Sequence, residues 1–333
     1  RCRNRASTVR IGVLKPEKTS FALQQISGVL RHRFVALLLT ESKVLGGVAI
    51  GSGGAIEGIR MSLAELSEWP VGTAAGALLR TDGSGIVETH GDLDRQYELA
   101  SVTKLLVAYG VLVAIEEEAI ALRHPAGPEG STVEHLLAHA SGVAFDSSDV
   151  MAPPETQRIY SSYGYELLAD LIEKESGIAF PEYLGEAVFE PLGMENSELA
   201  GPAGHGARST VSDLVRFAAE VAAPTLLDPG TVDGARSAHF PGLPGFVPGY
   251  GKFANNTWGL GFEVKGDKRA HWTGTRNSPR TVGHFGQAGT YLWLDPDLEL
   301  AAVVLTDRPF GSWAKPLWSE FNDRLISQEL QGE

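Results

Sequence analysis

The apolar residues of this 333-residue chain are most concentrated between Val102 and Ile115. Within this run only Thr103, Lys104 and Tyr109 carry polar side-chain atoms, so a helix formed here has no polar face. The three consecutive glutamates that follow mark the return of the chain to water. The pattern therefore predicts a helix that is buried on all sides.

The periodicity elsewhere predicts two groups of strands separated by helices. Strand patterns lie at residues 72–80, 86–90, 259–265, 281–295 and 298–306, and an Asp-Gly-Ser-Gly turn joins the first two as a hairpin. Helix patterns lie at 61–69, 131–139, 160–175, 180–193, 210–218 and 316–330, and a Pro/Gly-rich loop lies at 240–251. Early and late strands with helices between them indicate an α/β fold of the α+β type. We expect one antiparallel sheet of about five strands flanked by helices, with a mainly helical subdomain inserted.

The composition is that of an ordinary globular protein, with 43% hydrophobic and 21% charged residues. A net charge of −13 argues against nucleic acid or an anionic membrane surface as a partner. Cys2 is the only cysteine, so the chain forms no intrachain disulfide and no cysteine-based zinc site. This usage fits a reducing compartment.

The first 60 residues differ in charge from the rest, with ten Lys and Arg against three Glu and no Asp. The first methionine is Met61. We therefore expect an N-terminal extension outside the folded unit, followed by a single domain with two lobes. The expected divisions are 1–60 for the extension, 61–333 for the domain, 61–98 with 212–333 for the α/β lobe, and 99–211 for the helical lobe.

A signal peptide is the alternative interpretation of the extension. Its apolar core at 34–40 lies far from the start of the sequence and is followed by Glu41 and Lys43, which is atypical of such peptides. The same two charges argue against a membrane span. The sequence thus predicts a cytoplasmic protein with no membrane partner.

Ser101 and Lys104 lie three residues apart at the start of the apolar run. On a buried helix a lysine cannot remain charged and unpaired without a large desolvation cost. It must be paired, or its pKa must fall until it can act as a base. The serine hydroxyl beside it is then the group it activates. The structural alternative is that Ser101 caps the helix and Lys104 reaches the surface.

Two further segments carry candidate chemistry. Tyr160 begins a helix pattern, where a nearby cation would lower the pKa of its phenol for proton transfer; the alternative is an aromatic residue packed on the core. His284 and Gly286 lie within one strand pattern, and a glycine there suits close approach of a substrate or a β-bulge. The N–H of Gln287 can then bind an oxyanion together with the N–H of Ser101.

Two other constellations are disfavoured. His135 and His139 have the spacing of a zinc-protease helix, but the sequence between them lacks the glutamate that activates water. An α/β-hydrolase needs Gly-x-Ser-x-Gly, and no serine of the chain has these neighbours.

Taken in order, Ser-x-x-Lys, Tyr-Ser-Ser and His-x-Gly resemble the motifs of the serine β-lactamase and penicillin-binding-protein superfamily. The chain is most similar to the branch with class C β-lactamases, D-alanyl-D-alanine carboxypeptidases and related esterases. The resemblance runs from about Trp69 to the C-terminus. It includes the longer segments His135–Gly142, Tyr160–Tyr165 and Pro191–Met194.

The resemblance implies a role for each candidate residue. Ser101 is the acylated nucleophile, Lys104 accepts its proton, and Tyr160 carries a proton to the leaving group. The remaining expected substrate-binding residues are Ser162, His284, Gly286 and Gln287. The family implies neither a metal nor an organic cofactor, and its substrates are small esters, amides or β-lactams.

Two positions depart from the family pattern. Ser162 stands where the family usually has an asparagine that binds the acylamino group of the substrate. Phe285 stands where a Thr or Ser often binds the substrate carboxylate. Both changes favour simple esters or amides over β-lactams, so we expect an esterase. The alternatives are a β-lactamase or D,D-carboxypeptidase with the same site, and a catalytically silent binding protein of this fold.

Overall fold

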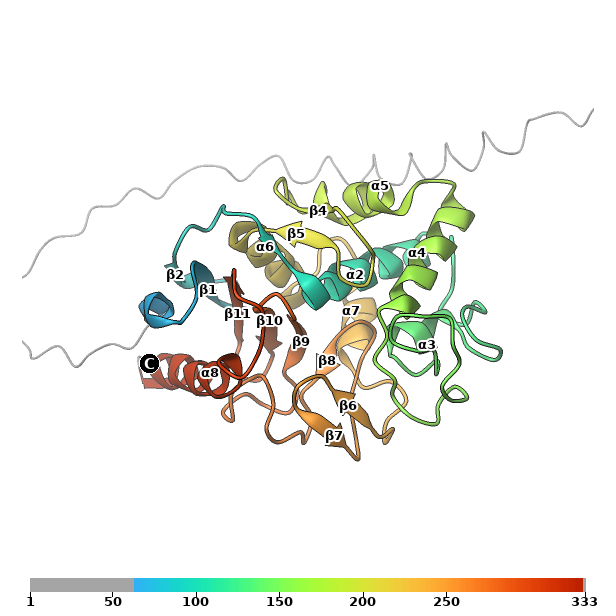
Figure 1. The fold of residues 1–333 in the computed structure, drawn as a ribbon. Coiled ribbons are helices and arrows are strands. Elements are labelled where there is room, and N and C mark those ends of the chain that lie inside the picture. Colours follow the sequence, from blue (N-terminus) through green and yellow to red (C-terminus); the bar gives the residue numbers. More distant parts are fainter. Residues whose placement is uncertain (1–62, 332–333) are drawn as a thin grey trace, which may run out of the picture. The chain divides into compact units, whose positions relative to one another are not determined.

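The computed structural model describes residues 63–331, so the predicted extension at 1–60 lies outside the described residues. Its largest element is a six-stranded antiparallel sheet of order β2-β1-β11-β10-β9-β8 (Figure 1). The strands are β1 (Ala74–Arg80), β2 (Gly85–His90), β8 (Glu263–Val264), β9 (Val282–Gly286), β10 (Thr290–Asp295) and β11 (Leu300–Thr306). The predicted fold class is confirmed, with one strand more than expected.

The segment predicted as one strand at 281–295 is a hairpin, so that prediction was wrong. β9 and β10 pair antiparallel from Gly286–Thr290 to Val282–Leu294. Gly289 adopts φ +87°, and its N–H donates to the Gly286 carbonyl at 3.0 Å. A left-handed glycine closes three-residue hairpin loops of this kind. The long hydrophobic run concealed the turn.

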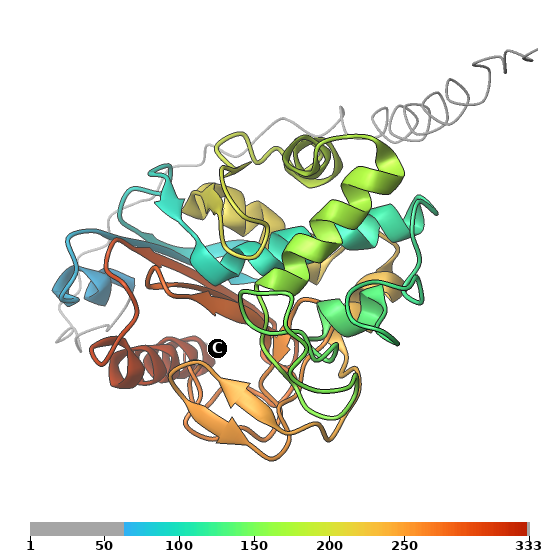
Figure 2. The same ribbon diagram turned by 45° about the vertical axis from the view of Figure 1, so that its right-hand side comes forward.

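Alternating residues of the central strands build two separate cores. Ala77, Leu292 and Val303 belong to the core on the side of α2 (Thr103–Glu116) and α6 (Val211–Ala222). Trp293 and Val304 belong to the core beneath α8 (Ala314–Gln331), which Trp318 and Phe321 of that helix complete. Figure 2 shows α6 and α8 on opposite faces of the sheet.

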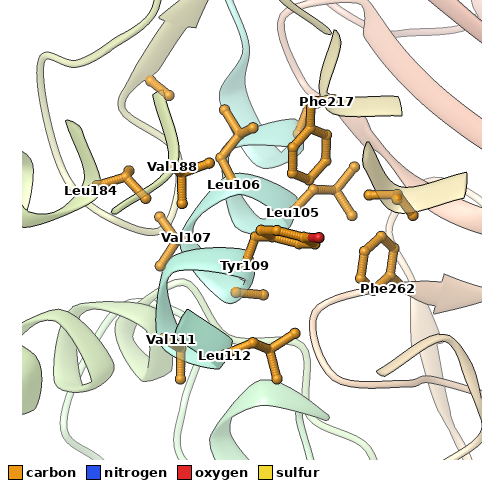
Figure 3. Packing of buried hydrophobic residues seen from close by; sticks show 14 of the residues in the cluster. Leu105, Leu106, Val107, Tyr109, Val111, Leu112, Leu184, Val188, Phe217 and Phe262 are labelled. Atoms are coloured by element: carbon orange, nitrogen blue, oxygen red, sulfur yellow. The ribbon is translucent and has the colours of Figure 1, made fainter. Parts of the chain in front are cut away.

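Helix α2 is buried on every side, as its sequence predicts. Its residues from Thr103 to Ala114 are all buried. Figure 3 shows Leu105, Leu106 and Tyr109 of this helix among side chains of the surrounding elements, including Phe217 of α6 and Phe262. The Tyr109 hydroxyl donates to Glu220 at 2.7 Å, so the buried phenol keeps a hydrogen-bond partner.

The other elements agree with the sequence prediction to different degrees. The helices are α3 (Val133–Leu137), α4 (Tyr163–Ser176), α5 (Phe180–Leu184), the π-helix η3 (Gly185–Phe189), α7 (Pro229–Arg236) and the 3-10 helices η1 (Leu63–Glu68) and η2 (Ala100–Val102). A small sheet of order β3-β5-β4 contains Tyr97–Glu98, Ala207–Ser209 and Glu198–Leu199. Helix α7 was not predicted, and residues 240–251 contain part of the hairpin β6 (Gly245–Val247) and β7 (Gly251–Phe253).

The strand predicted at 259–265 is reduced to the short β8. Gly261 has φ +89°, and a Cβ there would lie 2.1 Å from the Cβ of Ala108. The segment before β8 is therefore packed directly on α2 instead of extending the sheet. Within residues 63–331, none of the helices has the length and apolar character needed to cross a membrane.

We expect Leu106→Ala to lower the free energy of unfolding by about 3 kcal/mol. The substitution truncates a fully buried side chain and leaves a cavity that the surrounding residues fill only in part. Leu330→Ala is the matched control, since Leu330 is 51% exposed on α8; its effect should stay within about 0.5 kcal/mol. Urea denaturation measures both. Equal losses in the two variants would contradict the role of α2 as the centre of the core.

Candidate active site

Ser101 lies in the short helix η2, directly before α2. The preceding residue, Ala100, adopts φ +45°, an uncommon conformation for a residue with a Cβ. The N-cap of α2 is Val102, without a side-chain capping bond, so Ser101 does not cap this helix. Its hydroxyl instead interacts with the Tyr160 side chain and lowers the pKa of that phenol. The strained turn thus presents the half-buried serine to another segment.

Lys104 is completely buried one helical turn after Ser101. Its Nζ donates to the Gly204 carbonyl at 2.7 Å and to the Ser162 Oγ at 3.0 Å. It also lies 4.6 Å from the centre of the Tyr160 ring. Burial lowers the pKa of Lys104 to about 7, and the negative charge of Glu166 acts in the opposite direction. The amine is therefore available as a base near neutral pH.

Tyr160 joins the serine to His284. Its OH lies 3.3 Å from His284 Nε2, and His284 Nδ1 lies 2.7 Å from the Phe285 carbonyl. A carbonyl can only accept, so Nδ1 carries the proton and Nε2 accepts from the phenol. Burial lowers the pKa of His284 to about 3, with the Lys104 charge acting in the same direction, so the ring is neutral.

The pKa of Tyr160 is raised, mainly by burial, although its interaction with Ser101 lowers this pKa in part. The expectation that a neighbouring cation lowers this pKa was wrong. Burial among aromatic rings raises the pKa of Tyr160, and Lys104 does not offset this effect because the same burial favours its uncharged form. Tyr160 therefore keeps its proton near neutral pH and is a hydrogen-bond donor.

Aromatic rings enclose the Tyr160 side chain. The rings of His139 and Trp258 lie 4.7 and 5.8 Å from it. The ring of Phe145 stacks on it at 6.0 Å and is 52% exposed. Ser162 donates its N–H to the Phe145 carbonyl at 2.8 Å, which fixes this loop beside the site. Phe145 thus gives the candidate site an apolar rim.

Strand β9 lies directly against the turn that carries Ser101. A Cβ on Gly286 would lie 2.2 Å from the Leu99 carbonyl, and Thr290 Oγ1 donates to that carbonyl at 2.9 Å. Only glycine permits this approach. The turn that carries Ser101 therefore lies against the end of β9, next to the residue Gln287 whose N–H is the second expected oxyanion donor.

The remaining sequence-predicted residues occupy different positions. The Gln287 side chain is exposed, and its Nε2 donates to the Phe310 carbonyl at 3.0 Å. Its backbone N–H is therefore the only group of this residue that remains a candidate for the site. Phe285 is buried in the core beneath α8, 4.9 Å from the Phe310 ring. Its side chain does not line the site, so the expectation that this position affects the binding of a substrate carboxylate was wrong.

Sequence reasoning missed Gly204 and Glu166. Gly204 binds the Lys104 amine through its carbonyl, and Glu166 accepts the N–H groups of Gly204 and Ala203. The only sequence signal is the glycine-rich segment 201–206, which has no periodicity. The contacts above bring together five of the predicted residues: Ser101, Lys104, Tyr160, Ser162 and His284. Gly286 ends the strand that carries His284, and Gln287 begins the turn that follows.

Both histidines that have the zinc-protease spacing form hydrogen bonds, although only His135 lies in α3 and His139 follows the helix. His135 Nε2 lies 2.9 Å from Glu155, and its Nδ1 lies 2.8 Å from Thr132 Oγ1. His139 Nδ1 accepts the N–H of Ser161 at 3.2 Å. In the described part of the chain, no group of three or more His, Cys, Asp or Glu is arranged to hold a metal ion.

The depressed pKa of Lys104 makes the stability of the protein depend on pH. The unfolded chain binds a proton to this amine up to its usual pKa of 10.5, whereas the folded protein releases it near 7. Between these values stability rises with pH. We expect the wild type to gain on the order of 4 kcal/mol relative to Lys104→Met as the pH rises through this window.

Denaturation of both proteins at several pH values measures this difference. The polar partners that methionine leaves unpaired add a cost that does not change with pH, so the slope is diagnostic. A constant difference across the window would show that the folded protein keeps the amine charged.

Comparison with known proteins identifies the family. The pattern of the Beta-lactamase family matches residues 74–320. A crystal structure titled as a beta-lactamase from Mycobacterium bovis is 49% identical, with a TM-score of 0.78, over 80% of this chain and 98% of that one. A hydrolase with promiscuous acyltransferase activity, EstCE1, is 16% identical with a TM-score of 0.66 over 80% of this chain and 96% of its own; this likeness concerns the fold alone.

Among curated proteins, one of Escherichia coli O157:H7, proposed to be a D-alanyl-D-alanine carboxypeptidase, is 26% identical over 220 residues. The match covers 49% of this chain and 48% of that protein, so the chain spans about half the length of this relative. The family pattern covers all six strands of the large sheet and all the candidate residues, which confirms the resemblance inferred from the motifs. The chain therefore belongs to the Beta-lactamase family of serine hydrolases.

Proposed function

We propose that this protein hydrolyses small esters or amides through an acyl-enzyme on Ser101. One observation carries the proposal: the buried Lys104 amine, with a pKa of about 7, lies 4.6 Å from the centre of the Tyr160 ring, and the Tyr160 phenol interacts with Ser101. An uncharged amine beside an alcohol is the arrangement that activates a serine nucleophile.

In acylation, Lys104 accepts the Ser101 proton while Oγ bonds to the substrate carbonyl carbon. The N–H groups of Ser101 and Gln287 bind the oxyanion of the tetrahedral intermediate. Tyr160 gives its proton to the departing alkoxide and receives one from the Lys104 ammonium. The products of this half-reaction are the acyl-serine and a free alcohol.

In deacylation, water takes the place of the alcohol. The Tyr160 oxygen accepts one proton of the water, as the water oxygen attacks the acyl carbon, and passes its own proton to the Lys104 amine. The Lys104 ammonium then returns a proton to Ser101 Oγ as the bond from Oγ to the acyl carbon breaks, which restores the free serine and releases the acid. One positioned base typically contributes about 10²–10⁴-fold and one oxyanion donor about 10²–10³-fold. His284 holds the phenol in place by accepting its hydrogen bond.

Two features favour an uncharged ester or amide. The Ser162 hydroxyl accepts a hydrogen bond from Lys104 and supplies no carboxamide for an acylamino group. The exposed Phe145 ring lies beside Tyr160, where it can cover an apolar acyl or alcohol group.

A β-lactamase is the second candidate, because the Mycobacterium bovis relative carries that title at 49% identity. D,D-carboxypeptidase activity is a further candidate, because the Escherichia coli relative is proposed to be a D-alanyl-D-alanine carboxypeptidase. Both reactions use the same acyl-enzyme chemistry, so the substrate decides between them. A silent binding protein of this fold would use none of it.

Intact mass after treatment with a fluorophosphonate probe tests the acyl-enzyme. We expect one adduct on the wild type and none on Ser101→Ala, because the substitution removes the reacting oxygen. Absence of an adduct on the wild type would favour the silent binder. Turnover of short-chain p-nitrophenyl esters should exceed that of nitrocefin; the reverse order would favour the β-lactamase.

Tyr160→Phe should lower kcat for ester hydrolysis about 100-fold, because the variant has no acid for the leaving group. The fold should persist, since phenylalanine keeps the ring contacts with His139 and Trp258. Tyr183→Phe is the matched control. Tyr183 lies on helix α5, and its hydroxyl donates to Glu117, which follows the C-terminal end of α2, at 2.8 Å. Undiminished turnover in Tyr160→Phe would remove the tyrosine from the mechanism.

A further inference from the structure

The Glu166 carboxylate on α4 binds a loop and not the reacting groups. Its Oε1 accepts the N–H of Gly204 at 2.8 Å, and its Oε2 accepts the N–H of Ala203 at 2.9 Å. Two charge-assisted hydrogen bonds to consecutive amides fix the position and the orientation of the peptide that follows. The carboxylate is half-buried, so these bonds are partly shielded from water.

The carbonyl of the same glycine is the closest partner of the Lys104 amine, at 2.7 Å. Gly204 has little freedom to move on its other side. A Cβ on this residue would lie 2.7 Å from the Cβ and 2.8 Å from the carbonyl oxygen of Ser162. Glu166 and Ser162 therefore hold Gly204 between them, with its carbonyl directed at Nζ.

An uncharged amine has two N–H bonds and one lone pair. The Gly204 carbonyl and the Ser162 hydroxyl accept one N–H each. The lone pair then points away from both acceptors. In the proposed reaction it has to accept the proton of the Ser101 hydroxyl, which lies one helical turn before Lys104.

We propose that Glu166 is a positioning residue that, by holding Gly204, turns the lone pair of Lys104 toward Ser101. The inference rests on the proposed function, because it assigns Lys104 the role of base. Glu166 itself touches neither the substrate nor Ser101. Its effect passes through the Gly204 peptide to the amine.

Glu166 also opposes the effect of burial on the lysine, because its negative charge raises the pKa of Lys104. The other titratable groups facing the amine come from α4 itself and from three further segments, and they are uncharged near neutral pH. They are Tyr165 of α4, Tyr160 before it, His139 after α3, and His284 of β9, and burial disfavours the charged form of each. Among the described residues facing the amine, Glu166 thus supplies the charge that holds its pKa near neutrality.

Glu166→Gln tests the proposal, because glutamine keeps the size of the side chain, removes the charge and cannot accept both amides. We expect the plateau of kcat/KM for a p-nitrophenyl ester to fall about tenfold through kcat, with KM little changed. The acidic limb of the pH profile should move down by about one pH unit. Asp170→Asn is the matched control, since Asp170 is exposed one turn further along α4.

A purely structural role for Glu166 would lower the rate or the stability without moving the acidic limb, and that result would overturn the proposal. Gly204→Ala provides a second test that leaves the charge in place. Its Cβ must displace the peptide from Ser162, so the plateau of kcat/KM should fall at least about tenfold. Full activity in Gly204→Ala would show that the carbonyl need not be held.

Titration of ¹³Cε-labelled lysine by NMR reads the amine without any substrate. The Lys104 signal is assigned by its loss in Lys104→Met, and its midpoint should be lower in Glu166→Gln than in the wild type and in Asp170→Asn. An unchanged midpoint overturns the inference even if ester hydrolysis is confirmed. A wild type without ester turnover or a Ser101 adduct overturns the proposed function, and the titration still measures the coupling between Glu166 and Lys104.

Discussion

The exclusion of water from one amine is the constraint on which the site depends. Lys104 lies in a helix without a polar face, so its nitrogen has only the hydrogen bonds that other segments bring to it. The cost of burying an ammonium ion favours the neutral form. The apolar core of the helical part and the reactivity of the serine thus have the same physical origin.

The approach of β9 to the Ser101 turn connects this helix to the sheet. Because Gly286 has no side chain, the Leu99 carbonyl lies where a Cβ would otherwise be. Thr290, the first residue of β10, donates a hydrogen bond to the same carbonyl. Among residues 63–331, β8 pairs only with Val282 and Gly283, so no described strand covers the edge of β9 that follows. The turn of Ser101 and the uncovered end of β9 therefore lie next to each other, as the two proposed backbone donors for one oxygen require.

Much of this arrangement could be predicted from local pattern. The run from Val102 to Ile115 fixed the buried helix, and the Ser-x-x-Lys spacing indicated the candidate nucleophile and base. The pattern failed where a glycine changed the direction of an apolar segment, as at Gly261 and Gly289. It could not indicate Glu166 or Gly204, because their importance arises from contacts between segments distant in sequence. The raised pKa of Tyr160 depends on surrounding rings that no spacing predicts.

The pairing of β1 with β11 has a consequence for biosynthesis. β1 is one of the first elements of the described chain, but its partner begins only at Leu300, after all the helices except α8. While the ribosome makes the intervening residues, β1 has one unpaired edge and α2 lacks the sheet beneath it. Such long-range pairing slows folding and exposes apolar surface to aggregation. The nascent chain therefore needs protection until the last strand emerges, and a prematurely terminated chain has no complete sheet to support its serine.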